Sequence, residues 1–181
     1  MRDIWVFGYG SLMWRPGFVF VERQVATLPG FARRFCLASM HYRGTTEAPG
    51  LVLALSKEAG SACEGIAFRI AAPQAKTALA YLRARELVSY AYREERHAIR
   101  LSDGRVAEAL TYVSDPAHPQ FRGELGLQEK ARIIGKARGP AGSNRDYFFA
   151  TFAQLEALGI VDEELTALAG RLGTREETGR A

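Results

Sequence analysis

The spacing of apolar residues changes along this chain, and that change constrains the fold more than any single motif. In the first half, apolar residues form short β-branched or aromatic runs, or alternate with a period of two, as strands do. Between these runs, Gly30, Gly44, Pro49-Gly50 and Gly60 predict turns. The predicted strands are Ile4–Tyr9, Arg33–Ser39, Leu51–Ser56 and Cys63–Ile70.

The rest of the chain is predicted to form one helix, then a hairpin, and then further helices. A helix is expected from Pro73, since proline is favoured at the first helical position, through Glu86. The Asp103-Gly104 pair predicts a hairpin turn between two strands. The strands of this hairpin are Tyr92–Leu101 and Val106–Val113.

Three helices are expected in the last third of the chain. The stripe Leu127, Ala131 and Ile134 predicts the first helix. Ser143 or Asn144 is expected to cap the second helix, which ends near Gly159, and Asp162 the third, which ends near Leu172. The residues 173–181 read as a disordered tail, so the predicted domain is 1–172. Strands followed by helices predict an α+β fold with a largely antiparallel sheet or small barrel.

The composition argues against several classes of function. The chain has 181 residues and a net charge of +4, with basic residues dispersed among acidic ones, which argues against a nucleic-acid partner. Two cysteines and three well-separated histidines do not predict a metal site. The N-terminal apolar run is too short and too broken by glycine for a membrane span, so we expect a cytoplasmic protein.

The stretch "VFGYGSLMW", from Val6 to Trp14, interrupts a strand with two glycines. Gly8 and Gly10 permit positive φ and close backbone approach. Successive N–H groups of Tyr9, Gly10, Ser11, Leu12 and Met13 then form a candidate cradle for a carboxylate or an oxyanion. The alternative is a β-bulge or a tight turn without a ligand.

Glu86 is the candidate catalytic residue. It follows Leu79 by seven positions and Leu82 by four, so it lies on the helix face that should pack on the core. Burial of a carboxyl group raises its pKa, which suits a general base or acid near neutral pH. Two alternatives remain: the helix ends before Glu86, or Glu86 pairs with an arginine at the rim.

Two further residues are weaker candidates. Tyr90 is either a core aromatic residue or a hydroxyl donor to the same pocket. Arg43, in the polar loop "MHYRGT", is either a clamp for a substrate carboxylate or a solvated turn residue.

Five segments resemble, in order, those of the ChaC family of γ-glutamylcyclotransferases: "WVFGYGSLMWRPGF", "RRFCLASMHYRGTTEAPGLVLAL", "ACEGIAFRI", "YLRARE" and "GPAGSNRDYFFATFAQLEALGI". The resemblance implies a small mixed barrel with flanking helices in a single domain. It also implies a lyase-type cleavage of glutathione to 5-oxoproline and cysteinylglycine, without water and without a cofactor. Tyr9-Gly10-Ser11-Leu12 would be the substrate cradle and Glu86 the catalytic residue.

One departure from the family pattern bears on the substrate. The family commonly has Arg-Glu-Lys and then Gly-Gly-Tyr, whereas this chain has Leu87, Val88 and Ser89 between Glu86 and Tyr90. A lysine that would bind the glycyl carboxylate of glutathione is therefore absent. The alternatives are a cyclotransferase for other γ-glutamyl peptides or amines, and a binding module without catalysis. The sequence leaves the leaving group and the oligomeric state open.

Overall fold

Five strands close into a barrel in the computed structural model, which describes residues 2–173. Their order around the barrel is β1-β3-β2-β4-β5, and pairing of β5 with β1 closes it, with an additional pairing between β3 and β5. The strand bounds are Ile4–Gly8 (β1), Glu22–Ser39 (β2), Gly50–Ile70 (β3), Tyr92–Leu101 (β4) and Val106–Ser114 (β5). The ladders β1–β3, β2–β4 and β4–β5 are antiparallel, whereas β5 pairs in parallel with both β1 and β3.

The chain divides into two compact units. Met1–Arg33 and Ala54–Pro119 form the first, and Arg34–Leu53 and Gln120–Ala181 form the second. The long strands β2 and β3 each contribute residues to both units.

β2 and β3 are longer than the sequence predicted. They absorb the expected strands Arg33–Ser39, Leu51–Ser56 and Cys63–Ile70 and continue through Gly30 and Gly60. The predicted turns at these two glycines are therefore wrong. Both glycines have positive φ, 79° and 84°, a conformation that glycine adopts where a strand bends without ending.

The β4–β5 hairpin confirms the strongest local signal in the sequence. Its register runs from Tyr92↔Ser114 to Arg100↔Val106. At the turn, Gly104 has a φ of 88°, which a side chain would disfavour.

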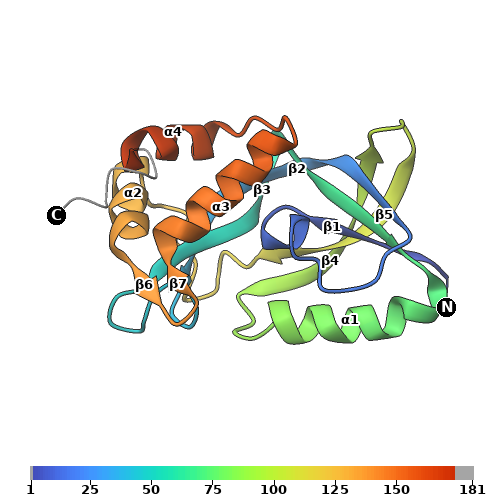
Figure 1. The fold of residues 1–181 in the computed structure, drawn as a ribbon, viewed down its shortest axis with the longest axis horizontal. Helices are drawn as coiled ribbons and strands as arrows, with labels where there is room; N and C mark the ends of the chain where they lie inside the picture. Colours follow the sequence, from blue (N-terminus) through green and yellow to red (C-terminus); the bar gives the residue numbers. More distant parts are fainter. Residues whose placement is uncertain (1, 174–181) are drawn as a thin grey trace. The chain divides into compact units, whose positions relative to one another are not determined.

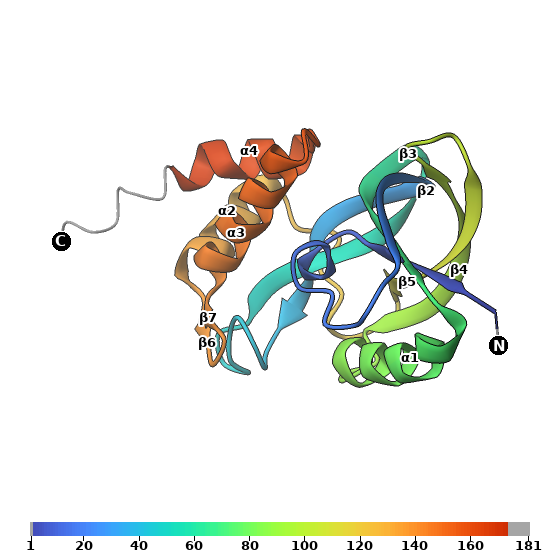
Figure 2. The ribbon, with the colours of Figure 1, turned by 45° about the vertical axis from the view of Figure 1, so that its right-hand side comes forward.

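Helix α1, Ala72–Glu86, begins with proline in its first turn, as predicted. Figures 1 and 2 both show it alongside the barrel strands of the first unit. It packs into an apolar cluster through Leu82, which is fully buried and by that burial contributes about 2 kcal/mol. The other cluster residues are Ile4, Val6, Leu12, Ile70, Ala75, Ala78, Leu110 and Tyr112.

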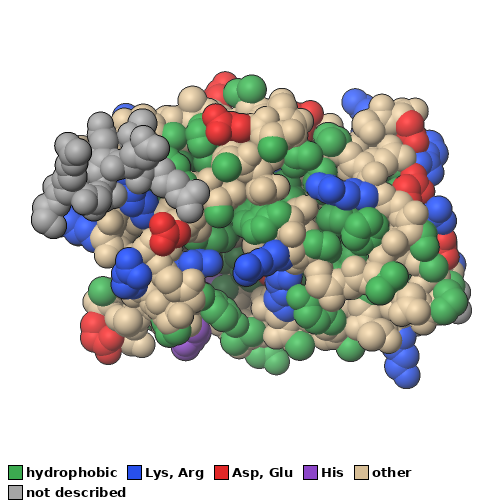
Figure 3. All heavy atoms as spheres, in the orientation of Figure 1, with side chains coloured by type: hydrophobic (Ala, Val, Ile, Leu, Met, Phe, Trp, Pro, Cys, Tyr) green, Lys and Arg blue, Asp and Glu red, His purple; other side chains and the backbone are tan. Residues whose placement is uncertain are grey.

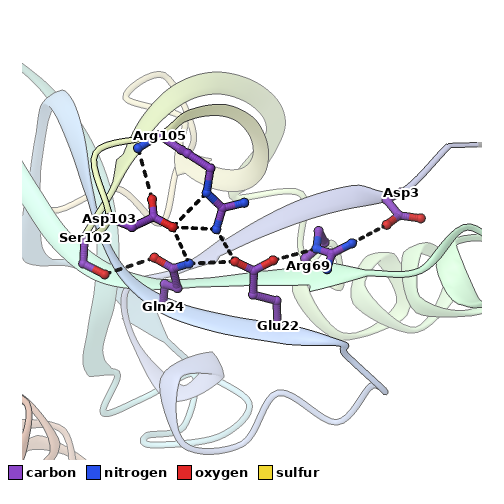
Figure 4. Close-up of polar contacts among 7 residues, drawn as sticks. All are labelled: Asp3, Glu22, Gln24, Arg69, Ser102, Asp103 and Arg105. Carbon is purple, nitrogen blue, oxygen red and sulfur yellow. Dashed lines mark hydrogen bonds and ion pairs between the residues drawn. The ribbon is translucent and has the colours of Figure 1, made fainter.

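A chain of polar contacts runs along the outside of the barrel, as Figure 4 shows. At one end Arg69 joins Asp3 (2.8 Å) to Glu22 (2.7 Å). At the other end Arg105 pairs with both Glu22 and Asp103. These groups are largely solvated, so each pair stabilises the fold only modestly.

Among its described residues, the second unit contains three helices and a short hairpin in addition to its parts of β2 and β3. The helices are α2 (Leu127–Lys136), α3 (Asn144–Ala157) and α4 (Glu163–Leu172), and the hairpin strands are β6 (Arg138–Gly139) and β7 (Gly142–Ser143). Ser143 caps α3 by accepting the Asp146 N–H, and Asp162 caps α4 by accepting the Leu165 N–H, so both predicted caps are confirmed. The β6–β7 hairpin connects α2 to α3.

Polar side chains also hold the interior of the second unit. Asn144 is fully buried and bonds both the N–H (2.6 Å) and the carbonyl oxygen (2.7 Å) of Leu51, as a neighbouring strand would. On α2, Ile134 of the predicted stripe is buried, but so is Lys130, whose ammonium group lies 3.0 Å from Glu164. Burial of a lysine is affordable here because its charge is paired.

Within residues 2–173, no helix has both the length and the apolar character that a membrane span requires. On the face drawn in Figure 3, basic and acidic side chains are interspersed among apolar ones. The tail predicted to be disordered lies, beyond Gly173, outside the described residues.

Candidate active site

The glycine-containing stretch forms a compact turn at the end of β1. The strand ends at Gly8, and a single 3-10 turn follows over Ser11–Met13. The Met13 N–H donates to the Gly10 carbonyl oxygen (2.9 Å), and the Arg15 N–H donates to the Ser11 carbonyl oxygen (2.8 Å). The amides of Ser11 and Leu12 begin the turn, so they have no acceptor within it.

Gly8 serves close packing rather than a left-handed backbone. Neither Gly8 nor Gly10 has positive φ, so the first reason given for them is wrong. The second reason is confirmed for Gly8, where an added Cβ would lie 2.9 Å from the Leu12 Cβ. Gly8 therefore lets the turn fold back onto the strand that precedes it.

Side chains of this turn point into the protein, which leaves its backbone as the candidate binding surface. Leu12 and Met13 are buried, and Leu12 belongs to the apolar cluster under α1. The buried Tyr9 donates its hydroxyl to the Tyr112 carbonyl oxygen (2.9 Å). Arg33, also buried, donates to the Tyr9 carbonyl oxygen (2.6 Å), a support for the loop that sequence reasoning missed.

Glu86 is the last residue of α1 and lies on its buried face. The helix does not end before Glu86, so that alternative is wrong. The carboxylate side chain is only 17% exposed, and Leu82, one turn earlier, is fully buried. Burial raises the pKa of Glu86 above its ordinary value, while the nearby Arg85 acts in the opposite direction.

Arg85 connects this carboxylate to the turn after β1. Its Nε lies 3.2 Å from Oε1 of Glu86, so the other predicted alternative, an arginine partner for Glu86, is partly right. The same guanidinium donates to the Ser11 hydroxyl (2.8 Å) and to the Arg15 carbonyl oxygen (2.6 Å). The structure thus brings the two main predicted features, the glycine-containing turn and Glu86, into one site.

Tyr112 of β5 is a further member of the site that sequence reasoning missed. Its hydroxyl donates to Glu94 (3.3 Å), and Arg83 holds Glu94 in a two-point pair (2.8 Å and 2.8 Å). Burial and the negative charges of Glu94 and Glu86 raise the pKa of Tyr112, so its hydroxyl stays protonated. Arg83 conversely lowers the pKa of Glu94, which leaves Glu86 as the carboxyl group of this site with the raised pKa.

The weaker candidates lie in different surroundings. Tyr90 is 75% exposed, so its interpretation as a core aromatic residue is wrong, and its φ of 56° is the one positive value among the non-glycine residues described. Arg43 belongs to the second unit, where it donates to the Ala141 carbonyl oxygen (2.5 Å) and lies over the Tyr147 ring. A substrate contact for either residue stays a prediction.

Comparison with known proteins gives consistent matches. The ChaC-like protein family model matches residues 4–175. The glutathione-specific γ-glutamylcyclotransferase of Escherichia coli K12 is 37% identical over 165 residues, which cover 91% of this chain and 71% of that protein. The human glutathione-specific γ-glutamylcyclotransferase 1 is 33% identical over 177 residues, or 96% of this chain and 80% of the relative.

A solved structure has the same fold. The crystal structure of a yeast γ-glutamylcyclotransferase specific to glutathione superimposes with a TM-score of 0.86 at 25% identity, covering 95% of this chain and 96% of the yeast chain. The predicted fold class, an α+β protein with a small mixed barrel and flanking helices, is therefore confirmed.

Proposed function

This chain belongs to the ChaC-like protein family, and we propose that it is a γ-glutamylcyclotransferase that cleaves glutathione to 5-oxoproline and cysteinylglycine. The names of its relatives support this activity. The observation that carries the proposal is the position of Glu86: a mostly buried carboxylate with a raised pKa, joined through Arg85 to a turn with inward-packed side chains. A binding module would not need a base at this position.

In the proposed reaction, Glu86 accepts a proton from the α-ammonium group of the γ-glutamyl unit. The freed amine attacks the γ-carbonyl carbon, and a bond forms between that carbon and the amine nitrogen. The bond to the cysteinyl nitrogen then breaks, and Glu86 returns a proton to the departing nitrogen. The ring nitrogen loses its second proton, and the released amine takes one up from water.

The turn after β1 would hold the substrate bent for this cyclisation. Attack within one molecule gains rate when the amine and the carbonyl carbon are kept close. Backbone N–H groups of Gly8–Met13 would bind the α-carboxylate or the developing oxyanion, with the Ser11 and Leu12 amides the best placed because they lead the turn. The Met13 amide closes the turn through Gly10 and would contribute less. No cofactor takes part in this scheme.

The leaving-group side of the substrate is less constrained. Arg43 and Tyr90 are proposed contacts there. Val88 is 53% exposed in the segment where the family pattern has Lys and Gly-Gly, and Tyr90, directly after this segment, is 75% exposed. This apolar segment favours, as a second candidate function, cyclotransfer from other γ-glutamyl peptides or amines. We place either reaction in the cytoplasm, with a small molecule as partner.

Product analysis with purified protein tests the proposal. Reduced glutathione should yield 5-oxoproline and cysteinylglycine in equal amounts with no free glutamate, because hydrolysis would release glutamate instead. Glu86→Gln should lower the rate by roughly 100-fold or more. Glu108→Gln is the matched control, since that carboxylate is 57% exposed on β5 and should leave activity unchanged.

Three outcomes are distinguishable. Formation of both products that depends on Glu86 supports the proposal. Turnover of another γ-glutamyl compound but not of glutathione supports the second candidate. Full activity of Glu86→Gln, or no turnover of any γ-glutamyl compound by the wild type, overturns the assignment of Glu86 as the base.

A further inference from the structure

We propose that Arg85 is a positioning residue that clamps the turn after β1 to the end of α1 and thereby keeps the substrate-binding amides in register with Glu86. The inference rests on the proposed function for its catalytic consequence, but its structural part is independent of turnover. Nothing in the sequence pattern assigned Arg85 a role, because it lies off the apolar stripe of α1.

The contacts of Arg85 are those of a fixed group rather than a mobile surface charge. Its guanidinium is held by three neutral oxygen atoms: the Arg15 carbonyl oxygen (2.6 Å), the Ser11 hydroxyl (2.8 Å) and the Tyr81 hydroxyl (3.1 Å). The side chain is only 23% exposed. A planar guanidinium with five N–H donors can satisfy all these acceptors at once, which an ammonium group cannot do in the same geometry.

These acceptors come from both sides of the site. Ser11 and Arg15 belong to the turn that follows β1, whereas Tyr81 lies one helical turn before Arg85 on α1. The clamp therefore joins two segments that are separated by 74 residues in the chain, as counted from Ser11 to Arg85. Loss of these guanidinium hydrogen bonds would let the turn move relative to the Glu86 carboxylate. A displacement of about 1 Å in an active site costs up to roughly 100-fold in rate.

Arg85 also faces the base itself. Its Nε lies 3.2 Å from Oε1 of Glu86. Its positive charge favours the ionised carboxylate and opposes the effect of burial. Among the described residues, Tyr112 of β5 interacts electrostatically with Glu86, and the Tyr112 hydroxyl is bonded to Glu94 of β4, which pairs with Arg83. Substitution of Arg85 leaves all of these in place.

Two substitutions separate geometry from charge. Arg85→Gln removes both the positive charge and the hydrogen-bonding geometry of the guanidinium, whereas Arg85→Lys keeps the charge and loses that geometry. For Arg85→Gln we expect a fall in kcat of roughly 10- to 100-fold and a shift of the acid limb of kcat/KM to higher pH, because the positive charge that favours the ionised carboxylate is gone. For Arg85→Lys we expect a similar fall in kcat with the limb close to that of the wild type. Arg132→Gln removes an arginine from an ion pair on α2 and should change neither quantity.

Two measurements decide the inference even without turnover. The titration of Glu86 is followed by the 13C chemical shift of its carboxyl carbon, with Glu86→Gln to assign the signal. The amide hydrogen exchange of residues 9–15 reports on the turn. In Arg85→Gln, the titration should move to higher pH and the exchange should accelerate, whereas a role in stability alone would lower Tm without moving the titration.

The outcomes distinguish the two proposals. If Arg85→Gln has the same Glu86 titration, the same amide exchange in the turn and the same kcat as the wild type, the role of Arg85 is overturned, whatever the substrate is. An inactive wild type with both changes present in Arg85→Gln would overturn the proposed function and leave the clamp standing. Arg85→Lys and Tyr81→Phe, each of which keeps part of the clamp, supply the test if Arg85→Gln does not fold.

Discussion

The guanidinium of Arg85 lies 3.2 Å from the carboxylate of Glu86, yet burial has the larger effect and leaves the pKa of Glu86 above its ordinary value. An exposed pair of this kind would lower the pKa of the acid. Here the carboxylate is 17% exposed and α1 ends on it, so the desolvation cost of the charge dominates. The balance keeps a carboxyl group that can both accept and return a proton.

The raised pKa of Glu86 predicts the pH dependence of activity. The base must be ionised to accept a proton, so kcat/KM should rise with pH along a limb above the ordinary glutamate value of 4.5. A profile of 5-oxoproline formation against pH checks this, with the folded state verified at each pH. A flat profile, or a limb below 4.5, would contradict the environment described for Glu86.

The same shift predicts how stability depends on pH. A carboxyl group with a raised folded-state pKa binds its proton more tightly when folded, so the stability it contributes is present below the unfolded pKa and is lost as pH rises through the folded pKa. Glu86→Gln should therefore have a higher Tm than the wild type near pH 7.5. Near pH 4 the two should melt together. Thermal melts at both pH values decide this, and a lower Tm for the variant at pH 7.5 would count against it.

Gly8→Ala should disturb the turn after β1. The added methyl group would lie 2.9 Å from the Leu12 Cβ, so the turn must shift, at a cost of about 1–3 kcal/mol in the free energy of unfolding. Activity should fall as well, because Leu12 and its amide move. Gly170→Ala is the matched control: this glycine is helical with no neighbour within 4 Å of an added Cβ, and the change should stabilise by about 0.5–1 kcal/mol. Equal melting of Gly8→Ala and wild type would show that the contact is relieved without cost.

Tyr90 has a backbone conformation that suits glycine. At a φ of 56°, Tyr90→Gly should be more stable than Tyr90→Ala by about 1 kcal/mol, because only the glycine escapes the clash of Cβ with the backbone. Urea unfolding of both variants measures the difference. If the exposed ring contacts the leaving group, KM should rise equally in both variants, which separates binding from backbone strain. Equal stabilities would argue that the loop relaxes around residue 90.

Asn144→Ala should be among the more damaging substitutions in the second unit. It leaves a buried N–H and a buried carbonyl group of Leu51 without their partner, at a cost of about 2–4 kcal/mol. Arg105→Gln offers a contrast in the network of Figure 4: its side chain is 51% exposed, so its loss should cost less stability than Asn144→Ala and should matter less at high salt. Denaturant unfolding at two salt concentrations compares the pair, and a larger loss for Arg105→Gln would reverse this ranking.

Many structural features were predicted from residues that are close together in the sequence. Helical spacing placed Glu86 on the buried face of α1 because residues three and four apart share a side of a helix. The caps at Ser143 and Asp162 and the turn at Asp103-Gly104 follow from neighbouring residues alone, and each is confirmed. The order of strands and helices left a choice between an antiparallel sheet and a small barrel, and the family resemblance chose the barrel and supplied the activity.

Contacts between distant segments decided the rest. The sequence by itself determined the helices, the β4–β5 hairpin and which carboxylate faces the core, since these depend on spacing and local backbone preference. Only the tertiary structure decided that Arg85 reaches Ser11, that the Tyr112 hydroxyl reaches Glu94 and that β5 closes the barrel against β1. Such contacts arise when the chain packs, and their partners are set by the three-dimensional path of the backbone, which short-range patterns do not specify.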